Sequence, residues 1–263
     1  MKILVTGHHG FIGSNLIKAL AKDYEVSGLE IGDPWPKIKG LQWVIHLGGI
    51  STTTERRVDV VMQNNYDFSV RLLDECYANG VNFQFASSAS IYGLGTNFAE
   101  DAPPDPRSPY AWSKYLVERY AKQSGYWRKI VVQCLRFFNV YGPGEDHKGN
   151  QASPHTQFAR QAKERGYIEL FAPMGAYKRD FIHVDEVIDY QVRFMECFES
   201  GTFNVGTGKA TSFLEVAQQV CDDIREIPMP EALRSQYQAF TCADMSKTNS
   251  ILEGLSWTTK PTS

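Results

Sequence analysis

A glycine-rich loop near the N-terminus is the first feature of this sequence that could do chemistry. Gly7, Gly10 and Gly13 stand in the spacing G-x-x-G-x-x-G directly after the apolar run 2–6. Gly7 permits a tight turn, Gly10 lets the backbone approach a pyrophosphate, and Gly13 allows a helix to pack closely on the strand. The N–H groups at the start of that helix would bind the anion. The pattern predicts a dinucleotide site rather than a simple tight turn, and it assigns no role to the bulky His8 and His9.

A serine and a Tyr-x-x-x-Lys pair could supply the groups for hydride chemistry. Ser88 follows the apolar run 83–87, and Tyr110 and Lys114 lie on a helix predicted over 108–124, four residues apart and so on one face. A free tyrosine has a pKa of about 10. We expect the Lys114 ammonium and a positively charged nicotinamide ring to lower that pKa, which makes Tyr110 a general base, while Ser88 holds the substrate oxygen. The alternative is a packed tyrosine and a solvated lysine.

Further cofactor contacts are predicted around the loop. Glu30 ends the second predicted strand, where a carboxylate would bind ribose hydroxyls and repel a 2′-phosphate. Lys37 and Lys39 follow it and could serve such a phosphate instead, so NAD and NADP both stay open. A solvated acid at a strand end is the alternative for Glu30. The remaining predicted cofactor residues lie at the start of the first helix, at and after the end of the 42–47 strand, and on the helices at 57–78 and 108–124. They are Phe11, Ile12, Leu47, Gly48, Gly49, Ser51, Asn64 and Lys114.

The composition limits the classes of function. The 263 residues are 43% hydrophobic and 22% charged, which is typical of a globular protein with a large core. The net charge of −3 gives no electrostatic case for a nucleic acid or a membrane as partner. The five cysteines are scattered without a C-x-x-C motif, so neither a disulfide framework nor a metal site is predicted. The cytoplasm is the expected location.

The order of the elements predicts a Rossmann-like, doubly wound parallel α/β fold. Apolar runs alternate with helical patterns, with strands expected at 2–6, 25–30, 42–47, 82–87 and 129–136 and helices at 11–22, 57–78 and 108–124. Gln42 comes only 12 positions after Glu30, and Pro34 and Pro36 disfavour a helix between them. We therefore expect the usual third strand to be missing.

The second half of the chain is less regular. Helices are expected at 153–165, 184–199 and 212–224, and short strands near 168–171, 179–183 and 202–205. Residues 1–145 are predicted to form the dinucleotide-binding domain, to which 179–205 return. Residues 146–178 and 206–263 are predicted to form a small substrate-binding lobe.

Several longer stretches resemble the NAD-dependent epimerase/dehydratase family of extended short-chain dehydrogenases. LRFFNVYGP at 135–143 and RDFIHVD at 179–185 are typical of that family. Within the family, HKG at 147–149 and YQAFT at 237–241 are most similar to the epimerases that act at C6 of an ADP-heptose. That branch favours NADP, whereas Glu30 favours NAD.

The resemblance implies a nucleotide-sugar epimerase that oxidises and re-reduces one carbon of its substrate. Two acid/base groups are implied on opposite sides of that carbon, and they match Tyr110 and Lys148. Arg179 would bind the substrate diphosphate, unless it pairs locally with Asp180 or Glu186. The other implied contacts are Val140 for the cofactor and Ser88, Asn139, Asn150, Gln157, Phe171 and Tyr237 for the substrate.

Asn150 and Gln157 depart from the serine and histidine usual in this family, which puts the exact sugar in doubt. A C4 epimerase of a nucleotide-hexose is the main alternative, and a non-catalytic dinucleotide-binding sensor is a second one. The resemblance also makes a homo-oligomer plausible, with the helices at 57–78 and 108–124 as its interface.

Overall fold

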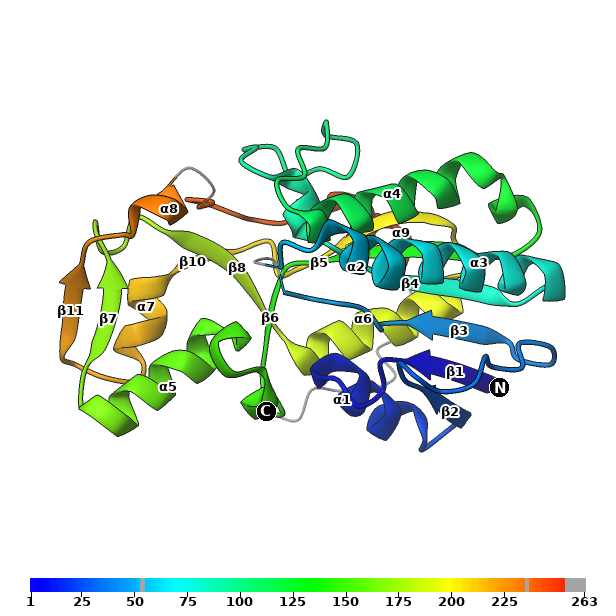
Figure 1. Ribbon diagram of the computed structural model, residues 1–263, viewed down its shortest axis with the longest axis horizontal. Coiled ribbons are helices and arrows are strands. Elements are labelled where there is room, and N and C mark those ends of the chain that lie inside the picture. The colour runs from blue at the N-terminus through cyan, green and yellow to red at the C-terminus, as the bar shows by residue number, and fades with distance from the viewer. Residues whose placement is uncertain (53–54, 235–236, 254–263) are drawn as a thin grey trace.

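A six-stranded parallel sheet lies at the centre of the computed structural model, which describes residues 1–52, 55–234 and 237–253 (Figure 1). Its strands are β1 (Lys2–Thr6), β2 (Glu25–Leu29), β3 (Trp43–His46), β4 (Asn82–Ser88), β5 (Val132–Phe137) and β9 (Gly201–Val205). They lie in the order β2-β1-β3-β4-β5-β9, and each neighbouring pair is parallel. This confirms the predicted Rossmann-like fold. The chain reverses its direction of travel through the sheet between β1 and β3, which is where such sheets bind ligands.

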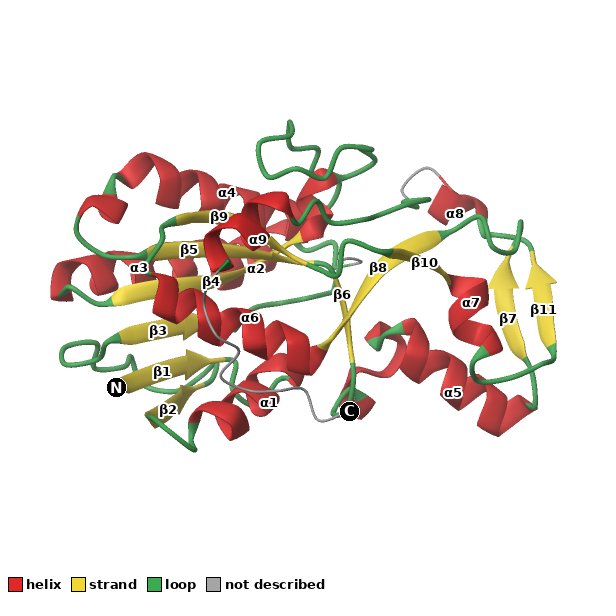
Figure 2. Ribbon diagram, turned by 180° about the vertical axis from the view of Figure 1, so that it is seen from behind, coloured by secondary structure: helices red, strands yellow, loops and turns green. Residues whose placement is uncertain are grey.

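Helices cover both faces of this sheet (Figures 1 and 2). One layer contains α2 (Val58–Met62), the π-helical turn η1 (Gln63–Asp67), α3 (Phe68–Asn79) and α4 (Pro109–Ser124), and the other contains α1 (Phe11–Leu20) and α6 (Val184–Cys197). Along β1, Leu4 packs with the α3 and α4 layer, whereas Ile3 and Val5 pack with the α1 and α6 layer. Apart from the edge strand β2, the sheet is largely buried on both faces, which explains the nearly continuous apolar runs of β1, β3, β4 and β5.

The sheet ends at β2, as predicted from the short segment after Glu30. Residues 30–42 form neither a helix nor a strand. Pro34 and Pro36 lie in this segment, and neither can donate a backbone hydrogen bond to a neighbouring strand. The cofactor side of the sheet is therefore open beyond β2.

A second group of elements lies past the carboxyl ends of β1 and β3 (Figure 1). It contains α5 (Pro154–Arg165), β7 (Ile168–Phe171), α7 (Phe213–Gln218), β11 (Ile224–Ile227) and α8 (Glu231–Arg234). A three-stranded sheet in the order β10 (Ala210–Ser212), β8 (Lys178–His183) and β6 (Asn139–Tyr141) links this group to the large sheet. The predicted division into two domains stays a prediction, and its last residues, 254–263, lie outside the described ones.

Some predicted elements differ from the structure because tertiary contacts decided them. The helix expected at 212–224 begins after its predicted cap, Ser212, but it ends at Gln218. Residues 219–223 form turns and irregular backbone, and 224–227 form β11, which pairs in parallel with β7. Pairing with that strand overrides the helix preference at residue 224. The strand expected from residue 129 begins at Val132. Strands β6 and β10 were not predicted, because three residues are too few for a periodic pattern.

The remaining elements are short. They are the 3₁₀ turns η2 (Ala89–Tyr92), η3 (Tyr126–Arg128) and η4 (Asp146–Gln151) and the helix α9 (Ser246–Leu252). Gly80 ends α3 with a φ of +68°, as predicted. None of the helices in the described part of the chain is long and apolar enough to cross a membrane.

Candidate active site

A pocket of about 440 Å³ lies at the carboxyl ends of β1 and β3, beside the glycine loop. Most residues predicted to bind the cofactor line it: Gly7, Gly10, Phe11, Ile12, Gly13, Glu30, Leu47, Gly48, Gly49, Ser51 and Asn64. The pocket wall also includes Ile31, Ile50, Phe68 and His147, which the sequence patterns did not assign to it. Small-molecule sites usually measure about 300–1,000 Å³. The binding role of these residues stays a prediction, but the structure brings them to one place.

The glycine loop is packed so closely that no side chain would fit at Gly7 or Gly13. A Cβ on Gly13 would lie 2.2 Å from the carbonyl oxygen of Gly7, and a Cβ on Gly7 would lie 2.7 Å from Cα of Gly48. Gly10 caps α1 without any side-chain hydrogen bond, so no side chain covers the first N–H groups of that helix. These features fit the pyrophosphate of a nicotinamide dinucleotide, which supplies a hydride acceptor and donor when it is bound.

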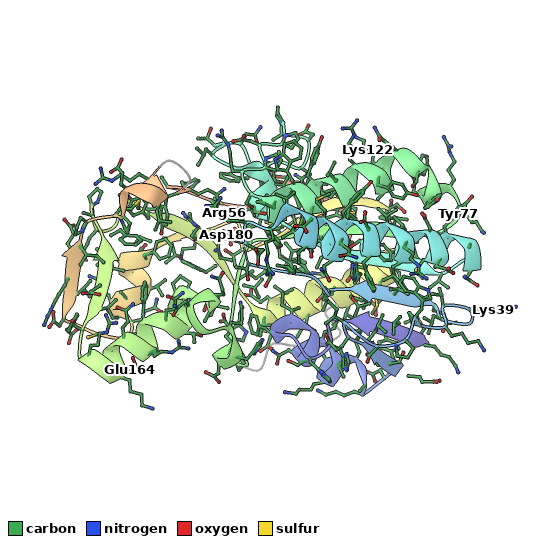
Figure 3. The ribbon with its side chains drawn as sticks, in the orientation of Figure 1. Lys39, Arg56, Tyr77, Lys122, Glu164 and Asp180 are labelled. Atoms are coloured by element: carbon green, nitrogen blue, oxygen red, sulfur yellow. The ribbon has the colours of Figure 1, made fainter. Side chains whose placement is uncertain are left out.

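The carboxylate of Glu30 is held by the glycine loop rather than left in solvent. The backbone N–H of His9 donates to its Oε1 atom at 2.7 Å, and Nδ1 of His8 lies 3.2 Å from the same atom. Lys37 and Lys39 do not line the pocket. Figure 3 shows Lys39 at the opposite end of the sheet, so it is not placed to bind a phosphate on the cofactor ribose.

A buried asparagine that the sequence patterns missed organises the floor of the pocket. Asn65 accepts a hydrogen bond from the backbone N–H of Ile50 (2.7 Å) and donates to the carbonyl of Ile50 (2.9 Å) and to Oγ of Ser113 (3.2 Å). It lies in the π-helical turn η1, whose extra residue per turn changes which side chains face the sheet. The predicted Asn64 lines the pocket while donating to the carbonyl of Val60. The Asn64-Asn65 doublet was the only signal in the sequence.

The structure places Ser88, Tyr110 and Lys114 together at the end of β4. Ser88 is the last residue of that strand, and its hydroxyl interacts with the Tyr110 hydroxyl and accepts from the backbone N–H of Ser90. Lys114 is buried beneath them, donates to the carbonyl of Ala86 at 2.8 Å, and has Nζ 5.7 Å from the centre of the Tyr110 ring. Ala86 itself lines the cofactor pocket. Their catalytic roles stay predictions.

Burial, rather than the charge of Lys114, governs the acidity of Tyr110 in the protein alone. Burial raises the pKa of Tyr110, and the hydrogen bond with Ser88 only partly opposes this. The expected lowering of the Tyr110 pKa, which included a bound nicotinamide cation, is not seen in the protein alone and stays a prediction for the complex with the dinucleotide. Burial also lowers the pKa of Lys114 to about 8 from 10.5. A bound nicotinamide cation would supply the positive charge that favours the phenolate.

We predict that Lys114→Met lowers activity strongly and changes how stability depends on pH. Below pH 8 the lysine is protonated in both the folded and the unfolded chain, so the folded wild type bears the cost of a buried charge. Between pH 8 and 10.5 the unfolded chain binds a proton that the folded chain does not, so wild-type stability rises with pH. The difference between the pKa values of Lys114 in the folded and unfolded chains limits this increase in the free energy of unfolding to about 3 kcal/mol.

Urea unfolding at pH 7 and pH 10 measures this effect. From pH 7 to pH 10, the free energy of unfolding of wild type should increase relative to that of Lys114→Met. Lys122→Met is the matched control, because Lys122 lies on the same helix and points into solvent (Figure 3). A stability difference between wild type and Lys114→Met that does not change with pH would contradict the prediction.

Lys148 enters the cofactor pocket from outside the large sheet. It lies in the 3₁₀ turn η4, lines the pocket, and has Nζ 5.0 Å from the centre of the Phe11 ring. Its Nζ is also 3.4 Å from Oε2 of the buried Glu145. Glu145 in turn accepts hydrogen bonds from the backbone N–H and hydroxyl of Ser153. Val140, predicted to bind the cofactor, does not line this pocket but packs between two parts of the core.

A second pocket of about 330 Å³ lies between α5, β7 and α7 in the smaller group of elements. Three residues predicted to bind substrate line it: Gln157, Phe171 and Tyr237. The rings of Phe171 and Tyr177 lie edge-on to Tyr237, with centroid distances of 6.0 and 5.0 Å. An aromatic box of this kind suits a flat ring such as a nucleotide base.

Arg179 lies next to this box and lacks the local ion pair considered for it. Its guanidinium carbon is 5.3 Å from the ring centre of Tyr237 and 5.4 Å from that of Phe213. Asp180 is fully buried and accepts instead from Thr207, Gly208 and Ala243, at the junction between the two groups of elements (Figure 3). Burial lowers the pKa of Arg179, so a bound anion would be favoured there.

The two remaining predicted substrate residues lie apart from both pockets. Asn139 begins β6 and pairs with Phe181 of β8, and it lines neither pocket. Asn150 is exposed, and its carbonyl accepts from the amide of Gln157 at 3.3 Å. The structure thus places Asn150 at the surface, where it contacts one residue of the second pocket.

The chain matches one family model over most of its length. Residues 3–33 and 35–206 match the model of the NAD dependent epimerase/dehydratase family. The chain belongs to this family. It is therefore an NAD(P)-dependent enzyme of the extended short-chain dehydrogenase type, with the fold of the nucleotide-sugar epimerases and dehydratases.

Solved structures of family members are similar to this chain. ADP-L-glycero-D-manno-heptose-6-epimerase of Helicobacter pylori is 25% identical, with a TM-score of 0.84 and coverage of 95% of this chain and 89% of that one. RMD of Pseudomonas aeruginosa, complexed with NADPH, is 25% identical, with a TM-score of 0.78 and coverage of 95% and 92%. UDP-N-acetylglucosamine 4-epimerase of Methanobrevibacter ruminantium M1 shares the fold at 24% identity, with a TM-score of 0.85 and coverage of 95% and 91%.

Proposed function

We propose that this enzyme inverts C6 of an ADP-heptose by transient oxidation and re-reduction with a tightly bound NAD(P). The observation that carries this proposal is the position of Lys148, which lines the same pocket as the glycine loop and Ala86, the carbonyl partner of Lys114. Lys148 thus lines a pocket whose wall includes the hydrogen-bond partner of Lys114, and Tyr110 does not itself line that pocket. Similarity to the Helicobacter pylori heptose epimerase supports the proposal.

The proposed chemistry divides the work among four side chains. A bound NAD(P) would supply the hydride acceptor and donor, and Tyr110, as the phenolate, would accept the proton of the C6 hydroxyl. Ser88 holds the resulting carbonyl oxygen, and Lys114 stabilises the phenolate. The ketone then presents its other face, and Lys148 donates a proton to the oxygen as the hydride returns. Two proton-transfer groups are needed because the hydroxyl lies on opposite sides before and after inversion.

The rest of the substrate would extend from this site toward the second pocket. We propose that the aromatic box beside Phe171 and Tyr237 receives the nucleotide base and that Arg179 binds the diphosphate. The guanidinium suits this role because it is buried against aromatic rings and, among the described residues, donates to the carbonyl of Lys178 rather than to a carboxylate. Charge-assisted hydrogen bonds to a phosphate would satisfy its remaining donors.

One observation favours a second candidate, a C4 epimerase of a nucleotide-hexose. Lys148 is held near the buried carboxylate of Glu145, so it could serve a structural role and leave Tyr110 as the one base. The fold of the 4-epimerase of Methanobrevibacter ruminantium shows that such an activity is compatible with this architecture. The two candidates differ in what they predict for Lys148.

Proton NMR of purified protein with ADP-D-glycero-D-manno-heptose and no added cofactor tests the proposal. We expect the C6 epimer to form without accumulation of reduced cofactor. In D₂O, C6 should retain its hydrogen, because the hydride leaves and returns within one active site. An unchanged heptose together with epimerised UDP-hexoses would establish the C4 alternative.

A variant of Lys148 separates the two mechanisms. Lys148→Met should lower heptose epimerisation by about 10²-fold or more, since general acid–base groups usually contribute about 10²–10⁴-fold. Lys163→Met, an exposed lysine on α5, is the control and should not change the rate. Wild-type turnover by Lys148→Met would contradict the two-base mechanism.

A further inference from the structure

Two histidines of the glycine loop and one carboxylate form a cluster that the epimerase chemistry does not use. The ring nitrogens of His8 and His9 and a carboxylate oxygen of Glu30 all lie within 4.8 Å of one another. Within the described part of the chain, it is the one group of three such side chains close enough to share a metal ion. The two imidazole rings lie against each other, with centroids 3.9 Å apart.

The fold leaves a defined place for the His8 ring. A Cβ on Gly28 would lie 2.4 Å from atoms of the His8 imidazole, so the ring occupies space that only a glycine in β2 leaves open. Nδ1 of His8 is buried and makes no hydrogen bond within the described residues, although it lies 3.2 Å from Oε1 of Glu30. A buried ring nitrogen of this kind needs a partner, and a metal ion between it and the carboxylate would be one.

We propose that His8, His9 and Glu30 bind a divalent transition-metal ion of the Zn²⁺ class. Two imidazoles and one carboxylate are a ligand set that suits Zn²⁺ or Co²⁺ and does not suit Mg²⁺, which prefers oxygen ligands. In a tetrahedral zinc site with bonds of about 2.0–2.1 Å, the ligand atoms lie about 3.3 Å apart. The His8–Glu30 distance of 3.2 Å already matches this value. His9 is exposed and free to close the remaining gap, with water as the fourth ligand.

Metal binding at this place competes with the dinucleotide. Glu30 lines the cofactor pocket, whereas His8 and His9 do not, so the carboxylate is the point where the two sites meet. A carboxylate that ligates a metal ion cannot also accept hydrogen bonds from the ribose hydroxyls. Linkage then requires that each ligand weakens the other by the same factor.

Isothermal titration of the full-length, tag-free protein, freed of bound dinucleotide, with Zn²⁺ tests the site. We expect one high-affinity Zn²⁺ per chain, and loss of a direct ligand in His9→Ala or Glu30→Gln should weaken binding by about 100-fold, since loss of an outer-shell partner alone costs about 10–100-fold. His147→Ala is the matched control, because His147 lines the same pocket outside the cluster. Equal Zn²⁺ affinity in wild type and in both cluster variants would overturn the proposal.

Two further readouts test whether cysteines bind the metal instead and whether the site is linked to the cofactor pocket. The visible spectrum of bound Co²⁺ should lack thiolate charge-transfer bands, whereas binding by cysteine would produce them and overturn the assignment. Saturating NAD should weaken Zn²⁺ binding at least tenfold in wild type. No competition would overturn the link to the cofactor pocket. None of these measurements depends on epimerase activity, so they stand apart from the test of the proposed function.

Discussion

Tyr110→Phe should abolish most of the activity of this enzyme while leaving its fold intact. The substitution removes one hydroxyl, which interacts with Ser88 at the end of β4. Since this hydroxyl is the proposed base, turnover should fall by about 10²–10⁴-fold. The aromatic ring stays in place, so the affinity for the dinucleotide should change little. Turnover by NMR and dinucleotide binding by fluorescence titration measure the two effects separately.

Tyr115→Phe is the matched control for this experiment. Tyr115 lies on the same helix α4 and packs edge-on against Trp112, with ring centroids 5.9 Å apart. The turnover of Tyr115→Phe should equal that of wild type. If Tyr110→Phe retained more than about a tenth of the wild-type turnover, Tyr110 would contribute less than a general base does. Another group would then have to act as the base.

Arg136→Met should cause the largest loss of stability among the substitutions considered. Arg136 on β5 forms two hydrogen bonds with the carboxylate of Glu118 on α4, at 2.7 and 3.0 Å, and their side chains are only 6% and 5% exposed. The hydroxyl of Ser87, next to Ser88, also donates to this carboxylate. Removing the guanidinium leaves a buried carboxylate without its cation, which costs about 3–5 kcal/mol. The free energy of unfolding in urea measures the loss.

Two further variants show whether the buried charge is the cause. Arg165→Met breaks an exposed ion pair with Glu169 on the surface, which should cost less than about 1 kcal/mol. Adding Glu118→Leu to Arg136→Met removes the stranded carboxylate and should restore part of the lost stability. If the double variant were less stable than Arg136→Met alone, packing rather than charge would explain the effect.

The proposed homo-oligomer stays a prediction. The helices named for its interface correspond to α2, η1, α3 and α4, which form one layer over the sheet (Figure 1). Val58 and Trp112 are exposed apolar side chains of this layer. Such exposed groups are common on protein surfaces and do not by themselves establish an interface.

The sequence by itself determined the central sheet, the helices on its two faces and which loops and strand ends meet around the glycine loop. These features depend on local patterns: apolar runs for buried strands, helical spacing for α3 and α4, and the glycines that keep the loop next to α1 and β3. The missing third strand was also predicted, since 12 positions with two prolines leave no room for it. Ser88, Tyr110 and Lys114 come together because α4 packs against β4, where Lys114 donates to the carbonyl of Ala86.

Only the tertiary structure decided which partner each polar side chain has. Glu30 is bound by His9 of the loop, Lys148 lies near Glu145, and Arg179 lies against aromatic rings. His9 is 21 positions from Glu30, and Tyr237 is 58 positions from Arg179, so no local pattern indicates these contacts. The Lys148–Glu145 pair is local, but the burial of Glu145 depends on the packed structure. The tertiary structure also decides the pKa of Tyr110 in the protein alone. Residue types suggested a nearby positive charge, but the pKa depends on burial, which only the packed structure determines.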